Sequence, residues 1–226
     1  MPVLSIAGAG TDIGKTYVAA ALLRALARRG LAIDALKPVA SGVDEADYTG
    51  SDPAMLLEAL GQPVTAETVA HIAPLRFAAP LSPPLAAKRE GRVLAFSDVR
   101  DLCQTRTTEV GDAILLVETA GGVMSPLDDD HTMLDLMAAL SGPVVLVSGS
   151  YLGAISHTLT ALACLRARGL QVAAVAVSES SGEAPFDETV AALARLAGDV
   201  PLVAFRRDAS PESSADDLAA RLAALF

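Results

Sequence analysis

With 226 residues, the chain is long enough for one large α/β domain with a substantial core, and too short for two domains of ordinary size. Hydrophobic residues make up 52% of it, but uninterrupted apolar runs such as residues 19–23 are far shorter than the roughly 20 residues of a membrane-spanning helix, so no membrane partner is expected. The formal net charge of −10 also disfavours nucleic acid as a partner, and a nucleotide would require a local positive site.

The predicted elements alternate between strands and helices along one expected domain, residues 1–226. Runs of Val, Ile and Leu without polar alternation predict buried strands at residues 3–7, 32–36, 113–117, 144–147, 172–177 and 202–205. Helical patterns lie at residues 16–29, 55–60, 96–109, 132–140, 155–168, 186–196 and 215–225. This alternation predicts a mostly parallel sheet with helices on both faces. The segment 73–84, rich in Pro and Ala, is expected to be an ordered surface connection.

The first strand is followed directly by the sequence GAGTDIGKT, residues 8–16, and then by the first helix. This is the context of a phosphate-binding P-loop, in which backbone N–H groups cradle phosphates, Lys15 reaches the β- and γ-phosphates and Thr16 places its hydroxyl on Mg²⁺. The first glycine of the strict pattern is Ala9 here. A dinucleotide-binding turn has no use for a lysine at the helix start. We therefore expect a three-layer α/β fold of the P-loop NTPase type.

Polar residues at the ends of two further strands predict the rest of the site. Lys37 and Ser41 follow the second strand, and Glu118 follows the third. Because the carboxyl ends of parallel strands meet at one edge, these residues can converge on the P-loop together with Asp52. Asp52 and Glu118 are suitable oxygen ligands for Mg²⁺, although Asp52 in Ser-Asp-Pro can also belong to a helix cap. Lys37 alone could be a solvated residue at a strand end.

These segments together resemble the dethiobiotin synthetase family. The resemblance is carried by KPVASG at 37–42, GKT at 14–16 and VE-x-AGG at 117–122, with further matches at 77–83, 90–92, 126–127 and 152–157, and it extends to about residue 177. It implies an ATP- and Mg²⁺-dependent ligase that forms dethiobiotin, ADP and phosphate from 7,8-diaminononanoate, CO₂ and ATP. The implied route passes through a carbamate and a carbamic-phosphoric anhydride. It also implies a cytoplasmic homodimer that holds the substrate carboxylate across the subunit interface.

The resemblance assigns roles to individual residues. Catalytic roles fall to Thr11, Lys15 and Lys37, and the Mg²⁺ ligands are Thr16, Asp52 and Glu118. The substrate contacts are Ser41, Gly153, Ala154, Ile155 and Ser156. The ATP contacts are Asp12, Ile13, Gly14, Lys15, Thr16, Tyr17, Asp52, Glu118, Thr119, Ala120, Gly121, Ser178 and Glu179. Ser178 and Glu179 depart from the Asn-Asp that family members often carry there to read adenine, and this departure favours a looser nucleotide preference.

Three alternative functions remain at this stage. A ParA-like or MinD-like switch ATPase shares the loop but usually carries a second lysine early in it, where this chain has Ala9, Gly10 and Thr11. A ligase domain of the cobalamin-synthesis type would normally come with a glutaminase domain. A non-catalytic interaction protein would have no reason to retain Lys15 and Lys37 together. The acidic run at 128–130 is expected to be solvated or to cap a helix rather than to bind a metal.

Overall fold

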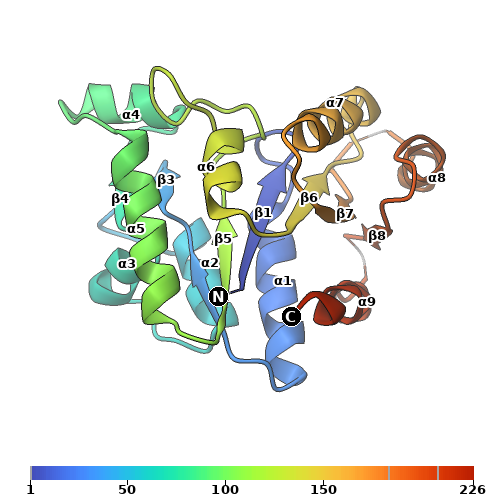
Figure 1. Ribbon diagram of the computed structural model, residues 1–226, viewed down its shortest axis with the longest axis horizontal. Helices are drawn as coiled ribbons and strands as arrows, with labels where there is room; N and C mark the ends of the chain where they lie inside the picture. Colours follow the sequence, from blue (N-terminus) through green and yellow to red (C-terminus); the bar gives the residue numbers. More distant parts are fainter. Residues whose placement is uncertain (1, 183, 208) are drawn as a thin grey trace.

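Six parallel strands form the central sheet of the computed structural model, which describes residues 2–182, 184–207 and 209–226 (Figure 1). Their order across the sheet is β2-β5-β1-β6-β7-β8. Each coincides with a predicted strand to within one residue at either end, so the predicted parallel sheet is confirmed. The strands are β1 (Val3–Gly8), β2 (Ile33–Leu36), β5 (Ile114–Glu118), β6 (Val144–Ser148), β7 (Val172–Ser178) and β8 (Leu202–Phe205).

Helices cover both faces of this sheet, which completes three layers (Figure 1). Successive side chains of β1 point to opposite faces of the sheet, and both faces are apolar. Leu4 and Ile6 pack against one helix layer, and Val3 and Ala7 pack against the other. The first layer holds α1 (Lys15–Arg28), α2 (Asp52–Ala59), α3 (Ala66–Ile72) and α9 (Glu212–Leu222), the last followed by a short 3₁₀ turn (Ala223–Leu225). The second holds α4 (Pro83–Arg89), α5 (Phe96–Glu109), α6 (Met133–Leu140), α7 (Ala154–Ala167) and α8 (Phe186–Leu196). Within the described ranges, none of the helices has both the length and the apolar character that crossing a membrane requires.

The segment 73–84 is more than the surface connection that the sequence predicts. Its residues Leu75–Phe77 form β4, which pairs in parallel with β3 (Val39–Ser41) in a small second sheet. Phe77 is buried in the core beneath α4 and α5. Strands of three residues are too short to show a period of two, so the prediction missed them. The small sheet also places Ser41, one of the predicted substrate contacts, at the end of β3.

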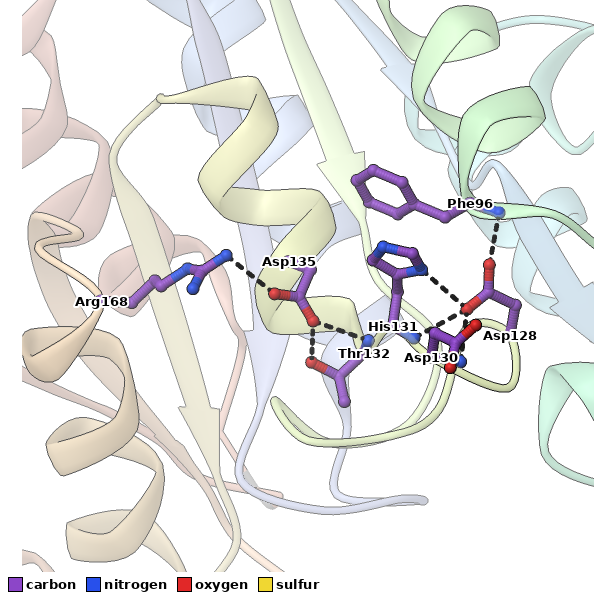
Figure 2. A network of polar contacts seen from close by, with 7 residues as sticks. All are labelled: Phe96, Asp128, Asp130, His131, Thr132, Asp135 and Arg168. Carbon is purple, nitrogen blue, oxygen red and sulfur yellow. Dashed lines mark hydrogen bonds and ion pairs between the residues drawn. The ribbon is translucent and has the colours of Figure 1, made fainter.

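Within the acidic run at 128–130, Asp128 caps a helix (Figure 2), and Asp129 and Asp130 are exposed to solvent, so the run shows both of the roles predicted for it. Asp128 Oδ2 accepts the backbone N–H of Phe96 at 2.7 Å, at the start of α5, and Oδ1 accepts the backbone N–H groups of Asp130 and His131 at 3.0 and 2.7 Å. These bonds use N–H groups that have no partner inside a helix or turn. The described residues contain no cluster of three or more His, Cys, Asp or Glu suited to a metal ion.

The next acidic residue, Asp135, ties two helices together in the same region (Figure 2). Its Oδ2 accepts from both the backbone N–H and the hydroxyl of Thr132 at 2.9 Å, which closes a capping box at the start of α6. Its Oδ1 accepts from Arg168 Nη2 at 2.9 Å, at the end of α7. Asp128 and Asp135 therefore act as structural anchors of the second helix layer.

We expect Asp128→Asn to lower the free energy of unfolding by about 1 kcal/mol at pH 7, the usual cost of a weakened helix cap. Partial burial by itself raises the pKa of Asp128, but the hydrogen bonds from Phe96, Asp130 and His131 outweigh it and hold the pKa below its usual value. The cap therefore contributes fully above about pH 4 and is lost as pH falls through the folded-state pKa. Urea unfolding at pH 7 and in the acid range measures both effects. Asp129→Asn, at an exposed neighbour, is the control, and an equal loss there would contradict the assignment.

Candidate active site

The P-loop connects β1 to α1 with a backbone shape that depends on its glycines. Gly14, the N-cap of α1, has φ 88°, in the left-handed region that favours glycine. A Cβ on Gly14 would lie 2.5 Å from Ser178 Oγ, and one on Gly8 would lie 2.7 Å from the Gly10 carbonyl oxygen. Gly14 is therefore favoured by its backbone conformation, and Gly8 by the close approach of other backbone atoms. The N-terminal N–H groups of α1 then face the loop, which suits a bound anion.

Lys15 folds back over the loop that precedes it. Its Nζ donates to the carbonyl oxygen of Gly10 at 3.0 Å, and the side chain is largely buried. Burial, and after it the charge of Lys37, lower the pKa of Lys15 to about 8. The ammonium thus lies on the loop where backbone N–H groups converge, and a bound phosphate would both replace the Gly10 contact and restore the pKa.

Lys37 forms the centre of a buried charge cluster beside Lys15. Its Nζ lies 2.5 Å from Glu118 Oε1, at the end of β5, and 2.7 Å from Asp52 Oδ2, in the first turn of α2. Glu118 Oε1 also accepts the Thr16 hydroxyl at 2.8 Å. Burial alone lowers the pKa of Lys37, but the two carboxylates raise it above its usual value. Lys37 is therefore a fully charged, paired ammonium and not a solvated strand-end residue.

Asp52 belongs to this cluster and not to the helix cap. The capping residue of α2 is Ser51, whose Oγ accepts the backbone N–H of Ala54 at 3.4 Å. Burial raises the pKa of Asp52, but the ammonium of Lys37, 2.7 Å from Oδ2, outweighs it and lowers the pKa below its usual range overall. The sequence Ser-Asp-Pro thus contains both a helix cap and a site residue: Ser51 caps the helix, and Asp52 faces the site.

The residues predicted to hold Mg²⁺ fit that ion chemically. Thr16, Asp52 and Glu118 present a hydroxyl and two carboxylates, which are hard oxygen ligands. Glu118 Oε2 is buried and has no hydrogen-bond partner among the described residues, so it retains an unused acceptor inside the cluster. An ion that also takes phosphate oxygens and water needs only a few protein ligands of this kind.

Two adjoining cavities receive most of the predicted site residues. The phosphate cavity, of about 290 Å³, is lined by Thr11, Asp12, Ile13, Gly14, Lys15, Thr16, Tyr17, Lys37, Ser41, Asp52, Met55, Ala120 and Gly121. The base cavity, of about 530 Å³, is lined by Thr11, Asp12, Ile13, Gly14, Tyr17, Tyr151, Ser178, Glu179, Ser180, Ser181, Phe205 and Arg207. They share the P-loop as a common wall. An elongated ligand with a polyphosphate end and a flat end suits this pair of cavities.

Three sets of predicted residues line neither cavity: Glu118, which is fully buried against Lys37 and Thr16, Thr119, and residues 153–156. Thr119 is fully buried and lines neither cavity, since its backbone N–H and its hydroxyl both donate to the carbonyl oxygen of Ile6. Residues 153–156 at the start of α7 are also outside both cavities; Gly153 and Ile155 line a separate hollow next to α8, and Ser156 is exposed. The structure of one chain therefore does not bring these residues to Lys37.

Five residues of the base cavity were not among the predicted contacts: Tyr151, Ser180, Ser181, Phe205 and Arg207. Tyr151 follows β6, Phe205 ends β8, and Arg207 donates its backbone N–H to Glu179 Oε2 at 2.9 Å. Their positions just after parallel strands are the one available sequence clue, because loops at that edge surround the ligand in open α/β sheets. Their chemistry belongs to no motif, so only the folded chain identifies them.

Comparison with known proteins places this architecture in a family. The AAA domain family matches residues 3–205. The chain is 52% identical over 215 residues to the ATP-dependent dethiobiotin synthetase BioD of Caulobacter sp. (strain K31), covering 95% of this chain and 92% of that protein. It is 53% identical over 203 residues to the ATP-dependent dethiobiotin synthetase BioD of Methylobacterium nodulans (88% and 90%).

Solved structures confirm the fold class. The cell division ATPase MinD of Pyrococcus furiosus superposes with a TM-score of 0.54 at 16% identity, covering 100% of this chain and 99% of that one. A ParA family ATPase from Chlorobium tepidum gives 0.50 at 14% identity, covering 99% and 91%. At such identities the likeness shows a P-loop fold and no more, whereas the sequence relatives, at 52% and 53% identity over most of the chain, show the family. The chain belongs to the dethiobiotin synthetase family of ATP-dependent ligases.

Proposed function

We propose that this protein closes a cyclic urea on 7,8-diaminononanoate, using CO₂ and Mg²⁺-ATP, and releases dethiobiotin, ADP and phosphate. One amine of the substrate takes up CO₂ and loses a proton to give a carbamate. A carbamate oxygen attacks the γ-phosphorus as ADP leaves, which gives a carbamic-phosphoric anhydride. The second amine then attacks the carbonyl carbon, and phosphate leaves as the ring closes.

The phosphate cavity is the observation that carries this proposal. It collects two ammonium groups, Lys15 and Lys37, with the Ser41 hydroxyl and the Thr11 side chain at its wall. A carbamate and a triphosphate repel each other, and two ammonium groups offset that repulsion as charge moves between them. Ser41 is placed to hydrogen-bond the carbamate or amine. No protein nucleophile is required, because the reaction depends on positioning and charge.

We further propose that Thr16, Asp52 and Glu118 hold Mg²⁺, which would neutralise phosphate charge when bound. The segment 12–17, with Ala120 and Gly121, would contact the triphosphate. Ser178 and Glu179 would lie beside the base. The inward-facing Thr119 side chain would act only by supporting its neighbours.

A homodimer is the assembly we propose. Residues 153–156 open the 14-residue helix α7, whose N–H groups suit a carboxylate, yet they lie outside the phosphate cavity of their own chain. The neighbouring Leu152 is 96% exposed, which is unusual for a large apolar side chain and fits a contact surface. A second copy would bring this helix start to the substrate of the first. Cytoplasmic location is proposed together with this biosynthetic role.

The decisive experiment measures phosphate release from Mg²⁺-ATP and bicarbonate, with and without 7,8-diaminononanoate, together with mass detection of the product. Diamine-dependent release with a cyclic urea appearing in step is the expected result. Lys37→Ala should abolish the diamine-dependent rate, whereas Lys88→Ala, at the exposed third lysine of the chain, should not change it. Hydrolysis indifferent to the diamine would favour a switch ATPase instead.

Nucleotide selectivity is a separate expectation. Glu179 offers only acceptor oxygens, and Oε2 is already used by the Arg207 N–H, so no side-chain amide can both donate to and accept from a base there. We expect kcat/KM for ATP, CTP and GTP to agree within about tenfold, a difference of about 1.4 kcal/mol. Glu179→Gln, which supplies an amide, should sharpen the preference. A wild-type preference for ATP of more than about a hundredfold would refute this expectation.

A further inference from the structure

The ammonium of Lys37 occupies the carboxylates that would hold the metal ion. It lies 2.5 Å from Glu118 Oε1 and 2.7 Å from Asp52 Oδ2, and both carboxylates are among the proposed Mg²⁺ ligands. Lys37 is 4% exposed and Glu118 is fully buried. In this state the cluster has one cation for two anions, and Glu118 Oε2 is left without a partner.

This arrangement conflicts with the other role proposed for Lys37. To stabilise a carbamate and a γ-phosphate, its ammonium must direct N–H groups into the phosphate cavity, toward the side that Ser41 lines. Two of its three N–H donors are used by Glu118 and Asp52. A divalent cation bound by the same two carboxylates would repel the ammonium and satisfy the oxygens that now hold it.

We propose that Lys37 is a resident counter-ion, which pairs with Asp52 and Glu118 until a divalent cation displaces it and frees its ammonium for the substrate. The inference rests on the proposed function for the identity of the metal ligands. The open side of the cluster is Asp52, whose side chain is 47% exposed, so a cation can enter there without unfolding the buried side. Metal loading and activation of Lys37 are then one event.

Removal of the lysine charge gives this idea a distinctive consequence. In the wild-type protein a metal ion without nucleotide must compete with Lys37, so it should bind weakly. In Lys37→Met the two carboxylates lose their cation, and nucleotide-free metal binding should become tighter. A neighbouring lysine that only repels the metal would give a gain as well, so movement of the Lys37 ammonium on metal binding has to be observed separately.

Electron paramagnetic resonance of Mn²⁺ without nucleotide measures this competition directly. We expect Lys37→Met to bind Mn²⁺ at least about tenfold more tightly than the wild type, and Lys37→Arg, which keeps a cation, to stay near it. Lys88→Met is the matched control and should not change binding. Adding Glu118→Gln to Lys37→Met should cancel the gain. Should methionine leave the chain unfolded, Lys37→Gln provides the same comparison, since its amide can still donate to Glu118.

The chain has only three lysines, so release of the ammonium can also be observed. With ¹⁵N-labelled lysine, the Lys37 ammonium resonance should shift or exchange faster when Mg²⁺ is added to the ADP-bound protein, while the Lys88 resonance stays unchanged. Equal Mn²⁺ affinity in wild type and Lys37→Met, or a Lys37 resonance that ignores Mg²⁺, would overturn the inference. Neither readout involves the diamine, so failure of the proposed reaction would be recognised separately by the turnover assay.

Discussion

A Lys15→Met variant is expected to lose about 10²- to 10³-fold in kcat/KM for ATP, the effect of removing one charged group that stabilises a transferring phosphoryl group. Methionine keeps most of the volume of the side chain, so the loop around Gly10 and Gly14 should retain its shape. The loss would therefore report the missing ammonium. Steady-state kinetics with the diamine and isothermal titration with ATP measure it, and circular dichroism checks that the fold is intact.

The pH dependence of ATP binding tests the role of the Lys15 charge in the wild-type protein, without a substitution. Because burial lowers the pKa of Lys15 to about 8, the unliganded protein loses this charge as pH rises through 8. Phosphates bind the protonated form, so the wild-type Kd for ATP should be nearly constant below about pH 7 and rise by up to about tenfold per pH unit above 8. Lys15→Met should show no such rise. Identical profiles for the two proteins would show that another group is responsible.

A Glu118→Gln variant is expected to lower both turnover and stability. It removes a proposed metal ligand charge, which should reduce kcat by about 10²- to 10³-fold. It also leaves the buried Lys37 ammonium with Asp52 as its remaining charged partner among the described contacts, which should cost about 3 kcal/mol, near the lower end of the range for a broken buried ion pair. Glutamine preserves the shape and can still accept from Thr16.

Urea unfolding and steady-state kinetics measure these two losses, with the exposed Glu58→Gln on α2 as control. The double variant Glu118→Gln, Lys37→Met should recover part of the stability, because it no longer buries an incompletely paired ammonium, while remaining inactive. Wild-type stability in Glu118→Gln would mean that the ion pair contributes nothing net. Unchanged activity would remove Glu118 from the metal site.

Much of this architecture was predictable because its determinants are local. The runs that became β1, β5 and β6 are apolar on both faces, and such runs are buried strands in any parallel sheet. The P-loop is a contiguous segment whose neighbours in sequence are its neighbours in space. Lys37 and Glu118 could be expected near it because each follows a strand whose direction the alternating pattern had already specified.

The tertiary structure alone decided which of these groups touch. Lys37 lies between Glu118 and Asp52, and Ser51 rather than Asp52 caps α2. Both arrangements depend on the relative positions of β2, β5 and α2, which no local sequence pattern specifies. The base cavity is likewise built by Phe205 and Arg207 from the far edge of the sheet. Apolar runs, helical periodicity and contiguous motifs are local features of the sequence, and so they determined the layers, the P-loop and the candidate residues. Contacts between segments distant in sequence depend on how the strands and helices pack in the core. The ion-pair cluster at the centre of the site could therefore be identified only from the tertiary structure.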